Sequence, residues 1–138
     1  MLTSPLGRAR ETAELAGLGS RAQVRDDLRE WDYGDYEGVT TADIRRQHPD
    51  WLLWRDGCPG GEQAADVGAR VDRVIAEVRA ADGDCALFAH GHVLRVLAAR
   101  WLGLPPSDGR LFALDPASLS ILGYERETPV IQRWNMPA

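Results

Sequence analysis

Residues 85–94 read Cys85-Ala86-Leu87-Phe88-Ala89-His90-Gly91-His92-Val93-Leu94, and they give the clearest indication of the fold class. Residues 85–89 are continuously apolar, which is typical of a strand buried on both faces of a parallel sheet. From Val93 to Leu102 apolar residues recur at helical spacing, and the Gly103-Leu104-Pro105-Pro106 sequence ends that helix. A buried strand that turns directly into a helix predicts an α/β fold.

Segments N-terminal to this stretch fit the same fold class. Residues 62–81 are expected to form the longest helix, because their valines and one isoleucine fall on one stripe and Asp82-Gly83 ends it. A first helix is predicted with Ser4 as its N-cap and Pro5 as its first residue, and good helix formers continue it from Arg8 to Ala16. Residues 2–4 look like the end of a buried strand.

The remaining segments predict shorter elements. We expect a short strand at 23–25, an aromatic and acidic loop at 28–38, and an apolar turn at 51–54. Thr40 and Asp43 form a capping-box-like start to a short helix that Pro49 ends. Alternation predicts strands at 110–114, 118–124 and 130–134, the last two joined near Thr128-Pro129. No repeat or linker interrupts the chain, so residues 1–138 are expected to form a single domain.

Composition excludes several classes of protein. The chain has 138 residues, 44% of them hydrophobic and 27% charged, as in ordinary soluble domains. A net charge of −5 argues against a nucleic-acid binder. Every basic residue is arginine, so cationic contacts to phosphate must come from arginine or histidine. Two cysteines make no metal-ligand pattern, and no segment resembles a membrane span or signal peptide. We expect a cytoplasmic protein with neither metal nor cofactor.

Three side chains are local candidates for a site. His90 follows a strand and begins a helix, where anions bind well, and Gly91 lets the backbone approach a ligand closely. Arg8 has the same position after the first strand. Glu30 lies beside aromatic residues, where burial would suit it to general-acid work. Taken singly, His90 could be a core histidine, while Arg8 and Glu30 could be solvated surface residues.

The tryptophans allow two readings. Trp31, Trp51 and Trp54 either close the core and cover the site or form an aromatic wall that binds substrate. Glu62, after two glycines, either bonds to backbone or substrate or caps the following helix.

Four short motifs, taken in order and spacing, resemble successive motifs of the histidine phosphatase superfamily, which includes phosphoglycerate mutase-like proteins. The resemblance covers nearly the whole chain. The motifs are Thr3-Ser4-Pro5-Leu6-Gly7-Arg8-Ala9, Leu28-Arg29-Glu30-Trp31-Asp32-Tyr33-Gly34, Gly60-Gly61-Glu62 and Ala89-His90-Gly91-His92.

This resemblance implies a three-layer αβα fold with a mostly parallel sheet. It also implies phosphate-ester chemistry through a phosphohistidine intermediate, without a metal. By position in the motifs, Arg8 and the backbone of Gly91 would bind phosphate oxygens. His90 would stabilise the phosphoryl group as it is transferred. Glu30 would protonate the leaving-group oxygen.

The sequence departs from the family in one respect. It contains no Arg-His-Gly motif, which in the family ends the central first strand and supplies the nucleophile. The chain's histidines are His48, His90 and His92, and His48 lies at a surface-like helix end. We therefore expect that an N-terminal strand-helix unit is missing, through a late start codon or a truncated gene. His92 is expected to be a supporting or surface residue, not a replacement nucleophile.

The function expected for the complete protein is hydrolysis of a small phosphorylated metabolite. A phosphatase is preferred to a mutase because the stretch between Glu30 and His90 is short, whereas a mutase needs a longer lid to exclude water. The alternatives are a phosphoglycerate-type mutase and a catalytically inactive phosphate-binding or interaction module. Whether the chain forms a homodimer is left open. Loss of a central strand would expose a gap in the sheet and lower the solubility of the chain.

Overall fold

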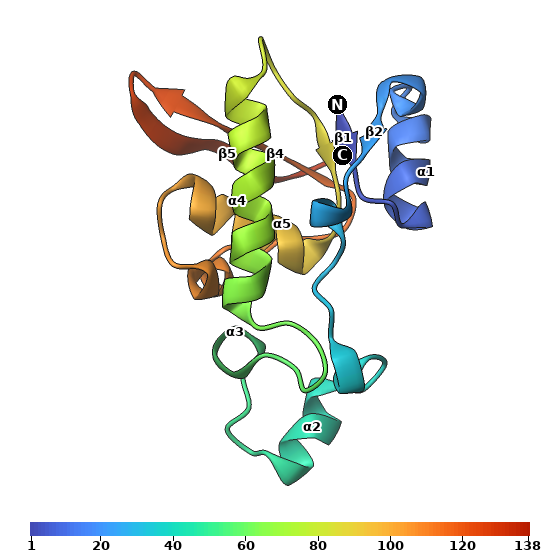
Figure 1. Ribbon diagram of the computed structural model, residues 1–138, viewed down its shortest axis with the longest axis vertical. Coiled ribbons are helices and arrows are strands. Elements are labelled where there is room, and N and C mark those ends of the chain that lie inside the picture. Colours follow the sequence, from blue (N-terminus) through green and yellow to red (C-terminus); the bar gives the residue numbers. More distant parts are fainter.

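The computed structural model describes residues 1–138 and contains a small parallel sheet at its centre (Figure 1). Its strands are β1 (Leu2–Thr3), β2 (Gln23–Val24) and β3 (Leu87–Phe88), in the order β2-β1-β3. Both neighbours of β1 run parallel to it, with Leu2 opposite Gln23 on one side and Leu87 on the other. The predicted α/β fold with a parallel sheet is confirmed.

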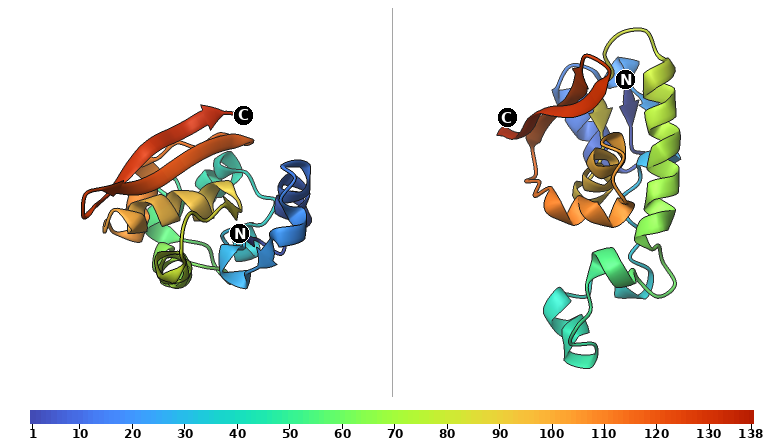
Figure 2. Two further views of the ribbon diagram at one scale, coloured as in Figure 1. Left: turned by 90° about the horizontal axis from the view of Figure 1, so that it is seen from above. Right: turned by 90° about the vertical axis from the view of Figure 1, so that its left-hand side faces the viewer.

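Three longer helices surround this sheet. α1 (Gly7–Leu15) and α4 (Ala64–Ala80) lie on opposite sides of β1, and α5 (Gly91–Trp101) follows β3 directly (Figures 1 and 2). α4 begins with a complete capping box between Gln63 and Asp66, which satisfies amides of its first turn. The predicted helix at 62–81 is therefore confirmed but starts two residues later.

The core forms where α4 meets α5. The valine stripe predicted for α4 is buried, and the apolar face of α5 packs against it. Burial of each such side chain stabilises the fold by roughly 1.5–3 kcal/mol. The residues concerned are Val67, Val71, Val74 and Ile75 of α4 and Val93, Val96, Leu97 and Trp101 of α5.

The last two strands form their own antiparallel sheet. β4 (Ser118–Glu125) and β5 (Thr128–Pro137) pair with each other and join at residues 126–127, slightly before the predicted turn. The indole nitrogen of Trp101 donates to the carbonyl of Gly123 at 3.1 Å, which ties this hairpin to α5. The strand predicted at 110–114 is wrong, because a 3-10 helix, η4 (Pro106–Leu111), takes residues 110 and 111 and residues 112–114 are irregular.

Much of the segment between β2 and α4 projects away from the sheet (Figure 2). It contains α2 (Thr41–Gln47) and α3 (Leu53–Asp56). Thr40 caps α2 as predicted, since its hydroxyl accepts from the Asp43 amide at 3.1 Å. Short 3-10 helices precede it: η1 (Gly19–Arg21), η2 (Asp26–Leu28) and η3 (Gly34–Tyr36).

Two local predictions are corrected. Ser4 does not cap α1, because the helix starts at Gly7 with Leu6 at the N-cap position. β3 is shorter than residues 85–89 and only half-buried, since it is the edge strand of its sheet and pairs with β1 alone. None of the helices combines the length and apolar character needed to cross a membrane.

Candidate functional site

The site begins where β1 and β3 end side by side. The Ser4 amide donates to the carbonyl of Phe88 at 2.8 Å, which fixes the two strand ends together. Ser4, one residue beyond β1, and His90, two residues beyond β3, meet with 2.8 Å between the Ser4 hydroxyl oxygen and His90 Nε2. Both side chains are buried, and His90 is the N-cap residue of α5. The predicted position of His90 at the carboxyl edge of the sheet is confirmed.

Charges from three other segments act on this imidazole. Burial lowers the pKa of His90 below its usual value, and the nearby carboxylate of Glu30 partly opposes that shift. The positive charges of Arg8 and Arg70 lower the pKa of His90 further. These charged groups belong to segments that are far from His90 in sequence.

Arg8 lies in the first turn of α1 and is exposed. Its guanidinium makes no hydrogen bond or ion pair with the rest of the chain, whereas Arg25 and Arg73 are held by carboxylates. A guanidinium without an internal partner at the edge of the sheet can accept an anion in its planar array of donors.

Glu30 occupies the N-terminus of α5. Its carboxylate oxygens accept from the amides of Trp31 at 2.8 Å, Val93 at 2.9 Å and His92 at 3.2 Å. We expected the first-turn amides of this helix to be free for an anion, and two of them are instead used by Glu30. The amide of Gly91, exposed and without a hydrogen-bond partner, is the donor that remains.

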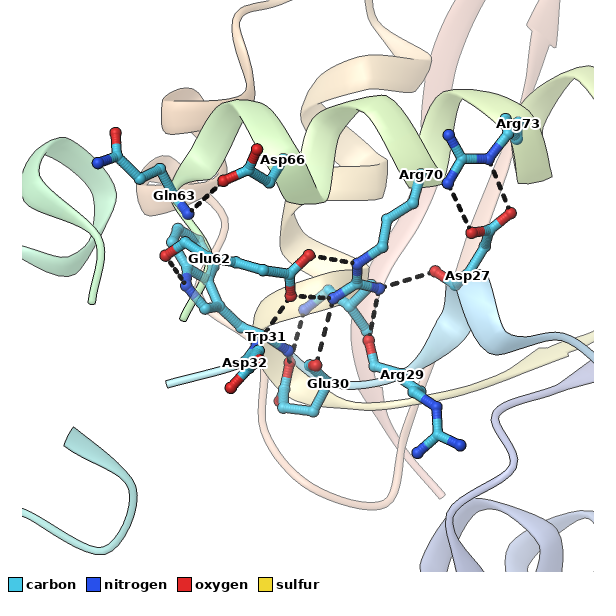
Figure 3. Close-up of polar contacts among 11 residues, drawn as sticks. Asp27, Arg29, Glu30, Trp31, Asp32, Glu62, Gln63, Asp66, Arg70 and Arg73 are labelled. Atoms are coloured by element: carbon cyan, nitrogen blue, oxygen red, sulfur yellow. Dashed lines mark hydrogen bonds and ion pairs between the residues drawn. The ribbon is translucent and has the colours of Figure 1, made fainter. Parts of the chain in front are cut away.

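A buried ion pair holds the loop that carries Glu30 (Figure 3). Arg70, on α4, binds the Glu62 carboxylate with two contacts of 2.9 Å. Its remaining donors reach three loop carbonyls: Asp27 at 2.8 Å, Arg29 at 2.6 Å and Glu30 at 3.2 Å. Sequence reasoning missed Arg70, although its position three residues after Val67 places it on the buried stripe of α4.

Glu62 resolves the alternatives left open for it. Its carboxylate accepts from the Asp32 amide at 2.9 Å, and its carbonyl accepts from the indole of Trp31 at 2.9 Å. It thus bonds to backbone and to Arg70, and the cap of α4 is formed by Gln63 and Asp66 instead. Together Glu62 and Arg70 fix the path of residues 27–32, and with it the position of Glu30.

His92 is surrounded by aromatic rings, and the surface reading of this residue is wrong. Its Nδ1 lies 2.5 Å from the Tyr33 hydroxyl, and its ring stands edge-on to Trp31 and Trp54 at centroid distances of 6.2 and 5.5 Å. Burial lowers the pKa of His92 and raises the pKa of Tyr33. Both groups are therefore favoured in their neutral forms.

Two hollows flank the projecting segment. One, of about 420 Å³, has His92, Tyr33 and Trp54 in its lining. The other, of about 660 Å³, has exposed His48 in its lining. Neither hollow is lined by Arg8, Glu30 or His90, but the smaller one is lined by His92, two residues after His90. No group of three or more His, Cys, Asp or Glu side chains is placed to hold a metal ion.

Comparison with known proteins gives consistent results. The model of the histidine phosphatase superfamily (branch 1) matches residues 1–137. An acid phosphatase of Mycobacterium tuberculosis is 43% identical over 127 residues, which are 91% of this chain and 62% of the relative. A sedoheptulose 1,7-bisphosphatase of Saccharomyces cerevisiae is 41% identical over 130 residues, which are 75% of this chain and 48% of the relative. The chain thus spans about half to three fifths of these curated relatives.

Solved structures match over almost the whole chain. The protein of open reading frame Rv3214 from Mycobacterium tuberculosis superposes with a TM-score of 0.93 at 40% identity, covering 99% of this chain and 71% of that one. A mycobacterial glucosyl-3-phosphoglycerate phosphatase complexed with inorganic phosphate gives a TM-score of 0.80 at 31% identity, covering 99% and 76%. The arrangement of strands and helices is therefore shared with phosphatases of known structure.

Proposed function

The chain belongs to the histidine phosphatase superfamily, and from this premise we propose that its site binds the phosphoryl group of a phosphomonoester and protonates the leaving alcohol. The observation that carries the proposal is the meeting of His90, Ser4 and Glu30 at adjacent strand and helix ends. These groups come from three separate segments of the chain, and Arg8, in the first turn of the helix that follows Ser4, is a cation without an internal partner.

Each side chain has a role that its surroundings support. Arg8 and the free Gly91 amide would bind phosphoryl oxygens, since both are donors without internal partners. His90, held by Ser4, would donate a hydrogen bond to the oxygens on which charge develops. Glu30, on its fixed loop, would pass a proton to the leaving oxygen once substrate displaces its bonds to α5.

The reaction also needs a nucleophile, which we propose to be a histidine that forms a phosphohistidine intermediate. None of this chain's histidines is placed for that task. His90 is committed to Ser4, His92 is bonded to Tyr33 through Nδ1, and His48 is exposed at the end of α2. The 138 residues thus carry the phosphate-binding and acid groups of the site, but not its nucleophile.

Turnover of p-nitrophenyl phosphate tests this division of roles. The 138-residue chain is expected to show negligible hydrolysis, while a form extended by an N-terminal segment with an Arg-His-Gly motif is expected to hydrolyse the ester. In that extended form, His90→Gln should lower kcat by about 100-fold or more, as loss of a transition-state donor does. Steady turnover by the 138-residue chain that disappears in a His92→Gln variant would instead identify His92 as the nucleophile.

A small phosphorylated metabolite is the proposed substrate, as the names of the relatives suggest for those proteins. A phosphoglycerate-type mutase is the alternative within the family. Interconversion of phosphoglycerates faster than their hydrolysis, measured on the extended form, would select the mutase.

A further inference from the structure

We propose that the 420 Å³ hollow beside His92 binds the alcohol part of the phosphomonoester, and that this part is apolar and aromatic. The inference rests on the proposed function, because it places the phosphoryl group at His90 and asks where the rest of the ester lies.

The lining of this hollow is mainly apolar and rich in flat rings. Its walls come from the loop after Glu30, from α2 and from α3, so they belong to the segment that projects from the sheet. Aromatic rings favour flat apolar ligands, which can stack or meet them edge-on. The apolar and aromatic members of the lining used here are Tyr33, Tyr36, Val39, Trp51, Leu52 and Trp54.

The rings are fixed before any ligand arrives. Tyr36 and Trp51 stand edge to face at a centroid distance of 5.5 Å, and the Trp51 indole donates to the carbonyl of Gly57 at 2.9 Å. Trp54 is buried against Trp31, also edge to face at 5.5 Å. A ligand that enters such a preformed apolar site loses little free energy to ordering the protein.

The hollow is linked to the proposed phosphate site through His92. His92 lines it and stands two residues after His90, and the His92 amide donates to Glu30 at 3.2 Å. An ester with phosphorus at His90 and its bridging oxygen toward Glu30 would direct its alcohol part into this space.

The same lining disfavours a sugar. Glu37, Thr41 and Arg45 also line the hollow, but all three residues are exposed. Among the less exposed polar groups, the Tyr33 hydroxyl and His92 Nδ1 are already bonded to each other. His92 Nε2 and the Tyr36 hydroxyl have no partner and could each serve one polar atom, but further buried hydroxyls of a polyol would lack hydrogen bonds. We therefore infer selectivity for an aryl ester over a polyol ester of the same charge.

Calorimetric titration of the 138-residue chain tests this without turnover. The probes are 2-naphthol, 2-naphthyl phosphate, glycerol 3-phosphate and inorganic phosphate. We expect 2-naphthol to bind by itself, and 2-naphthyl phosphate to bind at least about tenfold more tightly than glycerol 3-phosphate, because ring burial adds apolar contact.

Variants at the rim locate the binding. Val39 and Leu52 are lining residues that are 42% and 36% exposed, so Val39→Asp and Leu52→Asp change the wall without opening the core. Each should weaken 2-naphthol binding by about fivefold or more, since a charge is added to the apolar wall. Leu111→Asp, at a 60% exposed leucine outside the hollow, is the matched control and should leave binding unchanged.

The outcomes separate this inference from the proposed function. If inorganic phosphate binds but 2-naphthol does not, or if 2-naphthol binding ignores the rim variants, the inference is overturned and the phosphate site stands. A second outcome is that 2-naphthol binds and depends on Val39 and Leu52, while the phosphate compounds bind the His90→Gln variant as tightly as the wild type. In that case the proposed function fails, and the assignment of the hollow to a leaving group fails with it. Equal affinity for the aryl and glyceryl phosphates would also overturn the inference.

Discussion

At the level of single residues, the two histidines after β3 differ although they stand two positions apart. His90 is the N-cap residue of α5 and turns to Ser4 at the end of β1. His92, in the first turn of the helix, turns the other way, toward Tyr33 and the tryptophans. The successive side chains at a helix start point in different directions, so one strand-helix turn serves both a polar and an aromatic site.

These histidines also predict how stability depends on pH. Burial lowers the pKa of both in the folded protein, so the unfolded chain binds more protons as the solution is acidified. Their contribution to stability is therefore present above about pH 6.5 and is lost as the pH falls through the lowered values. We expect the free energy of unfolding, from urea titrations, to be smaller at pH 5.5 than at pH 7.5.

The variant His92→Phe should reduce that difference, because it removes one of the buried titrating groups. His48→Gln is the control, since His48 is exposed, and it should leave the difference unchanged. A pH dependence that is identical in the wild type and in His92→Phe would contradict the assignment to buried His92. Asp56, whose pKa is lowered to about 2 by its hydrogen bond to Arg55, cannot contribute in this window.

At the level of elements, α4 carries two arginines that pair with acids in different surroundings (Figure 3). The side chains of Arg70 and Glu62 are 11% and 21% exposed, whereas those of Arg73 and Asp27 are 64% and 33% exposed. Removing one partner of the buried pair leaves a charge and three carbonyls without their donors. The exposed pair is screened by water and contributes little.

We therefore predict that Arg70→Met lowers the free energy of unfolding by about 3 kcal/mol. Arg73→Met should lower it by less than about 1 kcal/mol. Chemical denaturation followed by circular dichroism measures both. Because Arg70 also positions the loop of Glu30, hydrogen exchange at the His92 and Val93 amides should quicken in Arg70→Met and not in Arg73→Met. Equal effects of the two substitutions would refute a special role for the buried pair.

At the level of the whole molecule, patterns that depend on local sequence were predictable and long-range contacts were not. The run at 85–89, the valine stripe of α4 and the Thr40 cap each express a local preference, and the elements they indicate are present. The strand expected at 110–114 failed because Pro105, Pro106 and Gly109 favour a tighter turn, and the Gly109 carbonyl accepts from Arg95.

The candidate site was predictable to a similar degree. Arg8, Glu30 and His90 were named from motifs; Glu30 bonds to the first turn of the helix that His90 caps, and the catalytic roles of all three residues stay predictions. The Glu62–Arg70 pair and the Tyr33–His92 pair join residues 8 and 59 positions apart. Spacing within one sequence carries no information on the second of these contacts, which depends on how the projecting segment folds back toward α5.

A ¹H–¹⁵N NMR titration of the 138-residue chain with inorganic phosphate would show whether phosphate binds between Arg8, His90 and the Gly91 amide. We expect saturable shifts of the Gly91 amide and the His90 imidazole. These shifts should be strongly weakened in Arg8→Gln and retained in Arg10→Gln, at an exposed arginine on the same helix. Shifts that do not saturate, or that persist in Arg8→Gln and centre on exposed residues such as His48, would contradict binding at this site.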